Sequence, residues 1–173
     1  MNTFLLFDLF FWTYVALLVC AAVFDVCRFI IPNWISIGLV VLFTAAFFVH
    51  PVRVDVVSHL GAMGLVLVAT LVMYRFKVIG GGDLKLFAAV GLWMGLDALP
   101  QFALWVAIIG GAFSLGLIVL RRLLTGVLVA QTVFGQVTLP RLLLPGERIP
   151  YGVAIAFGGI WLARQLPQLG LFA

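Results

Sequence analysis

The chain has 173 residues, of which 65% are hydrophobic and only 9% are charged, whereas soluble domains are about half apolar and about a quarter charged. This composition excludes a soluble globular protein and indicates an integral membrane protein surrounded by lipid. The formal net charge is +4. Because the basic residues are dispersed rather than gathered into a patch with interleaved aromatic residues, we expect no nucleic-acid partner.

Apolar stretches close to the ~20 residues needed to cross a bilayer recur along the chain, and none shows the roughly ten-residue alternating segments of an outer-membrane barrel. Backbone amides in lipid must be satisfied within their own segment, so we predict an all-α polytopic bundle that forms a single membrane-embedded domain over residues 1–173. We predict six spans, at residues 9–25, 34–49, 56–74, 83–99, 101–120 and 151–169. The breaks between them are predicted at Pro32-Asn33, His50-Pro51, the glycine run 80–82, Pro100 and Arg121-Arg122.

The first apolar stretch is predicted to be a retained helix rather than a cleaved signal peptide. The first charge in the chain is acidic, Asp8, and no Lys or Arg precedes Arg28, whereas a signal peptide begins with a basic region. Cys20 and Cys27 have neither the spacing of a zinc ribbon nor that of a redox CxxC motif. We interpret them as packing residues or incidental thiols, and we expect no metal and no cofactor.

The basic residues predict the orientation of the bundle. With six spans, the first, third and fifth connections share one side, and they hold eight of the ten Lys and Arg residues: Arg28, Arg75, Lys77, Lys85, Arg121, Arg122, Arg141 and Arg148. The other side has Arg53 and, near the end of the last span, Arg164. By the positive-inside rule, the three basic connections face the cytoplasm and both termini face out.

Residues 121–150 are broken by glycine, glutamine and proline and are not predicted to span. Arginines at both ends of an apolar middle favour a cytoplasmic segment that lies in the membrane interface. A re-entrant loop is the alternative.

Two acids lie at the predicted inner boundary of the membrane. Asp25 falls where the first span ends, and a carboxylate there faces the negative end of the helix dipole. Asp83 follows three glycines at the start of the fourth span, where a carboxylate caps exposed amides, so on its own it has a structural explanation. Carboxylates at a bilayer edge are costly and tend to be functional, and the pair therefore predicts a site.

The chemistry expected of such a pair is aspartyl proteolysis. Two carboxylates brought close together in a low-dielectric site share one proton near neutrality. One then takes a proton from water as the other protonates a peptide carbonyl, without a metal or a covalent intermediate. Gly80, Gly81 and Gly82 permit positive backbone angles and leave no side-chain bulk, so an extended substrate strand has room to approach Asp83. A merely flexible connection is the alternative for the glycine run.

Taken together, three features resemble the type IV prepilin peptidases: Asp25 ahead of Pro32-Asn33, the GGGDLK stretch at 80–85, and IPYGVAIAFGG at 149–159. The ordered set extends over nearly the whole chain. A GxGD motif also occurs in presenilin-like proteases, but the Tyr-Asp pair and the Pro-Ala-Leu-Pro element of that branch are lacking.

The resemblance implies an inner-membrane aspartic endopeptidase that removes a short basic leader from prepilins or pseudopilins at the cytoplasmic face. Asp25 and Asp83 match the catalytic acids of the family. We expect Lys85 to contact substrate or lipid phosphate, and Pro32 and Asn33 to end the inner loop and cap the second helix. A pilus or secretion assembly machinery is a further expected partner.

Longer members of that family carry a cytoplasmic region with paired CxxC motifs and also methylate the new N-terminus. Only about eight residues join the first two spans here, so we predict that N-methyltransferase activity is lacking, as in the short peptidases of tight-adherence (Flp-type) pilus systems. Two alternatives stay open. One is a small carrier or proton pathway with polar groups such as Thr70, Ser114 and Arg164, and the other is a non-catalytic membrane protein of pilus assembly.

Overall fold

The protein is a bundle of α-helices in the computed structural model, which describes residues 3–49, 55–76, 80–131, 141–144 and 147–165. The elements are α1 (Thr3–Arg28), α2 (Asn33–Val49), α3 (Val56–Arg75), α4 (Gly81–Gln131), the short 3-10 helix η1 (Arg141–Leu143) and α5 (Gly152–Gln165). The all-α prediction is confirmed over these ranges. Several predicted features lie outside them: the break at His50-Pro51, the basic residues Arg53 and Lys77, and residues 166–169 of the last span.

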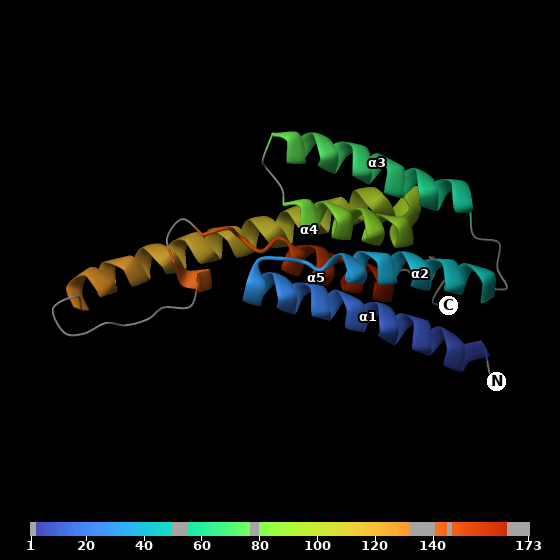
Figure 1. Cartoon of the computed structure of the whole chain (residues 1–173), viewed down its shortest axis with the longest axis horizontal. Coiled ribbons are helices and arrows are strands. Elements are labelled where there is room, and N and C mark those ends of the chain that lie inside the picture. The colour runs from blue at the N-terminus through green and yellow to red at the C-terminus, as the bar shows by residue number, and fades with distance from the viewer. Residues whose placement is uncertain (1–2, 50–54, 77–79, 132–140, 145–146, 166–173) are drawn as a thin grey trace.

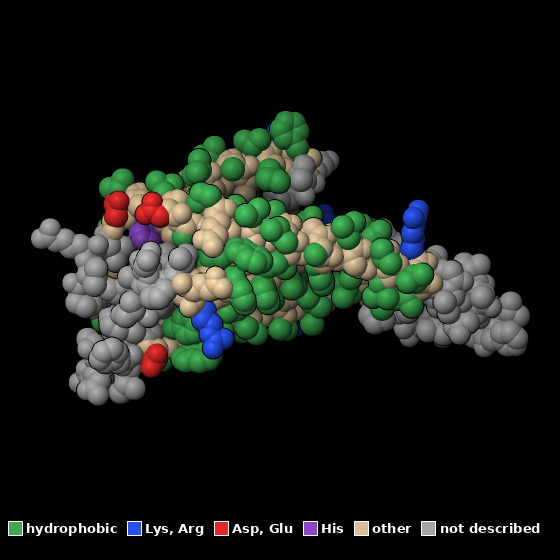
Figure 2. Space-filling view, turned by 180° about the vertical axis from the view of Figure 1, so that it is seen from behind, with side chains coloured by type: hydrophobic (Ala, Val, Ile, Leu, Met, Phe, Trp, Pro, Cys, Tyr) green, Lys and Arg blue, Asp and Glu red, His purple; other side chains and the backbone are tan. Residues whose placement is uncertain are grey.

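Three of the described helical segments are long and apolar enough to cross a membrane: Asp8–Arg28, Val56–Arg75 and Gly81–Leu124. The shorter α2 is also apolar. Large hydrophobic side chains lie exposed along the bundle and form the broad belt seen in Figure 2. The prediction of a helical membrane protein is therefore confirmed.

The fourth and fifth predicted spans meet at Gly95 and not at Pro100, so the predicted break was wrong. Gly95 has φ 66° and ψ 174°, a region of backbone space that is essentially restricted to glycine. The chain reverses there (Figure 1), which divides α4 into a first leg, residues 81–94, and a second leg, residues 96–131. Pro100 lies inside the second leg, close enough to its start that little helical hydrogen bonding is lost.

The end of that second leg also differs from the prediction. The sequence predicted a break at Arg121-Arg122, but α4 continues to Gln131, and its last turns project beyond the other helices (Figure 1). Arginine is a good helix former, so a pair of arginines does not end a helix by itself. Residues 132–140 and 145–146 lie outside the described part, and the interfacial placement of the segment 121–150 stays a prediction.

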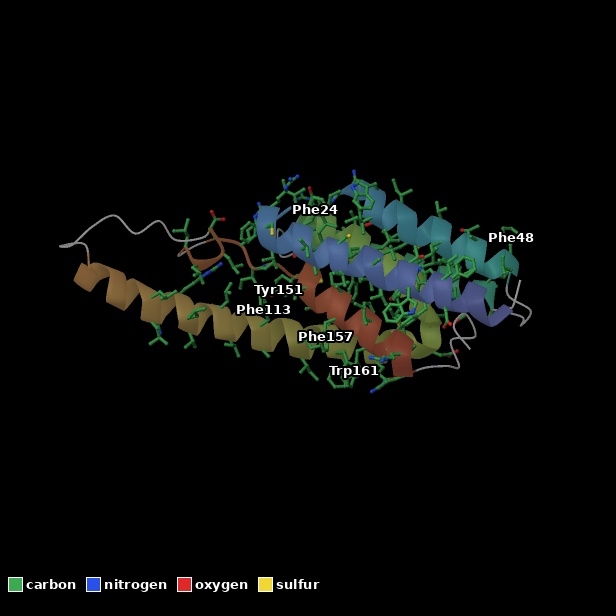
Figure 3. All side chains as sticks on the ribbon, turned by 90° about the horizontal axis from the view of Figure 1, so that it is seen from below. Phe24, Phe48, Phe113, Tyr151, Phe157 and Trp161 are labelled. Carbon is green, nitrogen blue, oxygen red and sulfur yellow. The ribbon has the colours of Figure 1, made fainter. Side chains whose placement is uncertain are left out.

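Packing brings three helix ends together. α4 packs against α2, α3 and α5, and α1 packs against α2 and α5. The core centres on Trp93, whose ring lies 4.8 Å from the ring of Tyr14 and whose Nε1 donates to the carbonyl of Leu39 at 3.0 Å. In this arrangement the end of α1, the start of α4 and the start of α5 meet at one end of the bundle (Figures 1 and 3).

Candidate active site

A cavity of about 1050 Å³ lies at this end of the bundle, and both acids singled out in the sequence line it. Its walls come from the end of α1 and the connection to α2, the end of α3, the start of α4, and the chain before α5. The lining includes Asp25, Phe29, Ile31, Asn33, Arg75, Gly80, Gly81, Gly82, Asp83, Glu147 and Arg148. Two carboxylates distant in the sequence thus share one cavity.

Asp25 is 5% exposed and is held from the start of α5. The backbone N–H of Gly152 donates to its Oδ2 at 2.6 Å. The sequence placed this carboxylate at the unfavourable end of α1, but its side chain reaches the first residue of α5, where unpaired N–H groups and the helix dipole favour an anion. This contact explains how α1 can end with a buried acid.

Gly152 is a site residue that the sequence reasoning missed. A Cβ atom built on it would lie 2.7 Å from Oδ2 of Asp25 and 2.9 Å from Cδ1 of Ile31. Only glycine allows the backbone of α5 to come this close to the carboxylate. The signal was the glycine of the IPYG stretch, which was used for the family resemblance but was given no role.

Phe29 directly follows α1 and lies four residues beyond Asp25. Its backbone N–H donates to the carbonyl of Asp25 at 2.9 Å, and its φ of 55° is the only positive value at a non-glycine position in the described residues. A left-handed residue commonly follows a helix, although glycine is usual there. The turn directs the chain through Ile31 toward α2 and leaves Phe29 in the cavity wall.

Asp83 combines a capping role with a place in the cavity. The carbonyl of Gly80 accepts from the N–H of Leu84 at 3.0 Å, the first hydrogen bond of α4, and the N–H of Gly80 donates back to the Asp83 carboxylate. This is the acidic half of a capping box. Asp83 also experiences repulsion from Asp25 and attraction from Arg148. The capping interpretation and the site interpretation are therefore compatible.

The glycine run serves the protein's own contacts. Among the described glycines only Gly95 has a positive φ, so Gly80, Gly81 and Gly82 do not use the positive backbone angles that glycine permits. A Cβ on Gly82 would lie 3.2 Å from Cβ of Ile31, and one on Gly80 would lie 2.9 Å from Oδ2 of Asp83. The missing side chains let the connection between α1 and α2 pack against the start of α4.

Lys85 lies outside the cavity lining and joins two helix starts. Its Nζ donates to Oδ1 of Asn33 at 2.9 Å, which links α4 to the first residue of α2. α2 begins at Asn33, directly after Pro32, and the Asn33 side-chain oxygen accepts from Lys85. Asn33 lines the cavity, whereas Pro32 and Lys85 are not among its lining residues.

Metal ligation has no candidate in the described part of the chain, where no group of three or more His, Cys, Asp or Glu side chains comes together. Cys20 and Cys27 are exposed free thiols. The titratable acids of the cavity are Asp25, Asp83 and Glu147, and Arg148 lies in the same lining.

These features define a class: helical membrane proteins in which two aspartates from different helices line one cavity at one end of the bundle. The sequence model of the type IV leader peptidase family matches residues 12–115, more than half of the chain and including both acids. The chain belongs to this family.

Curated relatives share parts of the sequence. The prepilin leader peptidase/N-methyltransferase of Bacillus subtilis (strain 168) is 30% identical over 111 residues, covering 64% of this chain and 45% of the relative. The protein of the same name from Aeromonas salmonicida (strain A449) is 41% identical over 69 residues, 36% of this chain and 24% of the relative. The protein of the same name from Burkholderia pseudomallei (strain K96243) is 42% identical over 62 residues, which cover 32% of this chain and 20% of the relative. The chain thus spans less than half the length of these relatives, and no solved structure matches it.

Proposed function

We propose that the protein is a membrane-embedded aspartic endopeptidase that removes the leader peptide from prepilins or pseudopilins at the cytoplasmic face of the bacterial inner membrane. The observation that carries this proposal is the placement of Asp25 and Asp83 in the walls of one cavity. Family membership supports leader peptides as the substrate class, and the names of the relatives support prepilins.

In the proposed reaction the two carboxyl groups share one proton, because two neighbouring carboxylates in a low-dielectric site do not both ionise. The ionised group takes a proton from water as the water oxygen bonds to the carbonyl carbon, and the protonated group gives its proton to the carbonyl oxygen. When the C–N bond breaks, the departing amine takes the proton that came from water. The re-forming carbonyl returns its proton to the pair, which is then ready for another cycle.

The proposed topology has six spans with the cavity on the cytoplasmic side. The reversal at Gly95 supports six spans, because the two legs of α4 count separately. The distribution of charge supports the orientation: Arg75 and Arg148 line the cavity, whereas acidic side chains gather at the opposite end on the face shown in Figure 2. Cytoplasmic ends of membrane helices are rich in Lys and Arg, and in this topology both termini face out.

We further propose that the protein lacks N-methyltransferase activity, as a short peptidase of the Flp-pilus type. Only residues 29–32 separate α1 from α2, which leaves no room at that connection for the additional region of the longer enzymes. A pilus or secretion assembly machinery would take up the cleaved product.

The carrier alternative receives less support from the polar groups in the helices. The Thr70 hydroxyl donates to the carbonyl of Val66 at 2.6 Å, and the Ser114 hydroxyl donates to that of Gly110 at 2.6 Å. Hydroxyl groups bonded to their own helix in this way are common in membrane helices and need no transported solute. The peptidase is therefore the better-supported function.

Co-expression with a candidate prepilin tests the proposal. We expect mass spectrometry to find a mature pilin that has lost its leader and carries an unmethylated N-terminus, and to find only precursor with Asp25→Asn or Asp83→Asn. Cleavage by both variants at the parental rate would contradict the mechanism. A methylated terminus would contradict the short-form assignment alone. Pilus formation with the double variant would favour the non-catalytic assembly protein.

A further inference from the structure

Arg121 occupies an unusual position for a charged residue near the end of a membrane helix. It is 8% exposed, whereas its neighbour Arg122 is exposed. Its guanidinium donates to three backbone carbonyls: Nε to Leu142 at 3.0 Å, Nη1 to Glu147 at 2.8 Å and Nη2 to Arg148 at 3.3 Å. One side chain of the second leg of α4 therefore holds the chain at two points, at η1 and just before α5.

The chain held in this way leads directly into the candidate active site. Glu147 and Arg148 line the cavity, and Arg148 attracts Asp83 electrostatically. Four residues beyond Arg148 is Gly152, whose N–H donates to Asp25. The chain bonded to Arg121 thus supplies one group to each acid of the pair, although Arg121 itself is not among the cavity-lining residues.

We propose that Arg121 is a positioning residue of the active site: it fixes the chain around Glu147 and Arg148 so that Arg148 keeps its place in the cavity lining that it shares with Asp83. Arginine suits this role because its planar fork directs several N–H donors at fixed angles, whereas a lysine ammonium is a flexible point charge. The proposal has two parts. Its structural half, that Arg121 fixes the chain around Glu147 and Arg148, does not depend on activity. Its catalytic half, that this placement supports cleavage, rests on the proposed function.

Limited trypsin digestion of the detergent-solubilised protein tests the structural half. Losing hydrogen bonds to a charged donor loosens the held chain, so we expect cleavage after Arg148 to be at least about tenfold faster in Arg121→Gln than in the parent. Arg122→Gln is the matched control, since it removes the same charge from an exposed position, and it should digest like the parent. If Arg121→Gln and Arg122→Gln yield the fragment ending at Arg148 at equal rates, the proposal is overturned. This outcome does not depend on whether the protein is a peptidase.

Prepilin cleavage tests the catalytic half, provided that the parent protein cleaves. We expect Arg121→Gln to lower kcat by about ten- to a hundredfold, because displacement of a positioned group by about 1 Å has effects of this size, and to change KM much less. Arg121→Lys, which keeps the charge and the stem, should recover only part of the loss. It also serves as the second variant should Arg121→Gln not accumulate as folded protein.

A double-mutant cycle separates positioning from general destabilisation. If Arg121 acts through Arg148, Arg121→Gln should lower kcat less in an Arg148→Gln background than in the parent background. Effects that simply multiply would contradict the proposal. Inactivity of the parent protein would instead contradict the proposed function and leave the digestion result to decide the structural half.

Discussion

The two ends of the first leg of α4 look alike in sequence and differ in structure. At one end Asp83 follows Gly82, and at the other Asp97 follows Gly95 by two residues; each acid lies close to the start of a helical leg. At the reversal the neighbouring polar groups bond to each other. Nδ1 of His59 lies 2.7 Å from the carbonyl oxygen of Leu92, and the N–H of Leu96 donates to Oγ of Ser58 at 3.0 Å. Asp97 itself is exposed.

At the other end the polar groups surround a cavity. Asp83, Asp25 and Arg148 come from three parts of the chain and line one space. An acid at a helix start is explained by capping and by the dipole in either case. The comparison shows that the acid becomes a functional candidate only when groups distant in the sequence converge on it around a space for substrate. Substitutions at each end test whether the two ends differ in this way.

Apart from replacement of the two acids themselves, the largest effect is expected for Gly152→Ala. The added Cβ would lie 2.7 Å from Oδ2 of Asp25, so the carboxylate or the start of α5 must move. A displacement of this kind costs about a hundredfold in rate, measured as kcat for prepilin cleavage by purified protein. Gly111→Ala is the matched control, because a Cβ there meets nothing within 4 Å. Exposed substitutions of this kind change stability by about 0.5 kcal/mol or less, so its kcat should stay near the parental value. Equal rates for the two variants would show that the contact of Gly152 with Asp25 does not matter for cleavage.

At the reversal, Gly95→Ala should affect stability rather than chemistry. Alanine at φ 66° and ψ 174° costs about 1–3 kcal/mol, and its Cβ would also lie 3.3 Å from Cε1 of His59. We expect a loss of that size in the free energy of unfolding, measured by SDS titration in mixed micelles. The kcat of the remaining folded protein should be unchanged. A fall in kcat without a loss of stability would contradict this account, because it would assign a catalytic role to the reversal at Gly95 and not to the cavity end alone.

A smaller effect is expected where Lys85 bonds to Asn33 at 2.9 Å. Lys85 is exposed, and hydrogen bonds in such places contribute about 0.5 kcal/mol. Lys85→Met and Asn33→Ala should therefore be coupled by about that amount in a double-mutant cycle on the free energy of unfolding. Lys85→Met alone should leave KM for a prepilin nearly unchanged. A large rise in KM would support the substrate contact in the expectation that Lys85 contacts substrate or lipid phosphate.

The sequence predicted what local chemistry determines. Hydropathy predicted the helices because a membrane requires apolar segments with internally bonded backbones. Pro32 predicted the start of α2, and the two costly acids singled out residues that line one cavity. The break at Pro100 was wrong because a proline near a helix start is tolerated, whereas the unusual backbone angles that only glycine adopts at position 95 leave no signal in composition.

The remaining features depend on contacts between distant parts of the chain. The N–H of Gly152 and the side chain of Asp25 are far apart in sequence and meet only because α1 packs against α5. The bonds from Arg121 to the carbonyls of Leu142, Glu147 and Arg148 likewise use backbone groups, which carry no residue signature. A single sequence offers no means of predicting such pairings.

The most direct test of the central claim compares four Asp→Asn variants in one cleavage assay: Asp25, Asp83, the two together, and Asp97 as the matched acid at the other end. If Asp25 and Asp83 act as a unit, each single variant should lose about a thousandfold or more in rate, the scale of general acid–base catalysis, and the double variant should be no slower than either. Asp97→Asn should cleave like the parent. A single variant at Asp25 or Asp83 that keeps a rate well above that of the double variant would contradict the account.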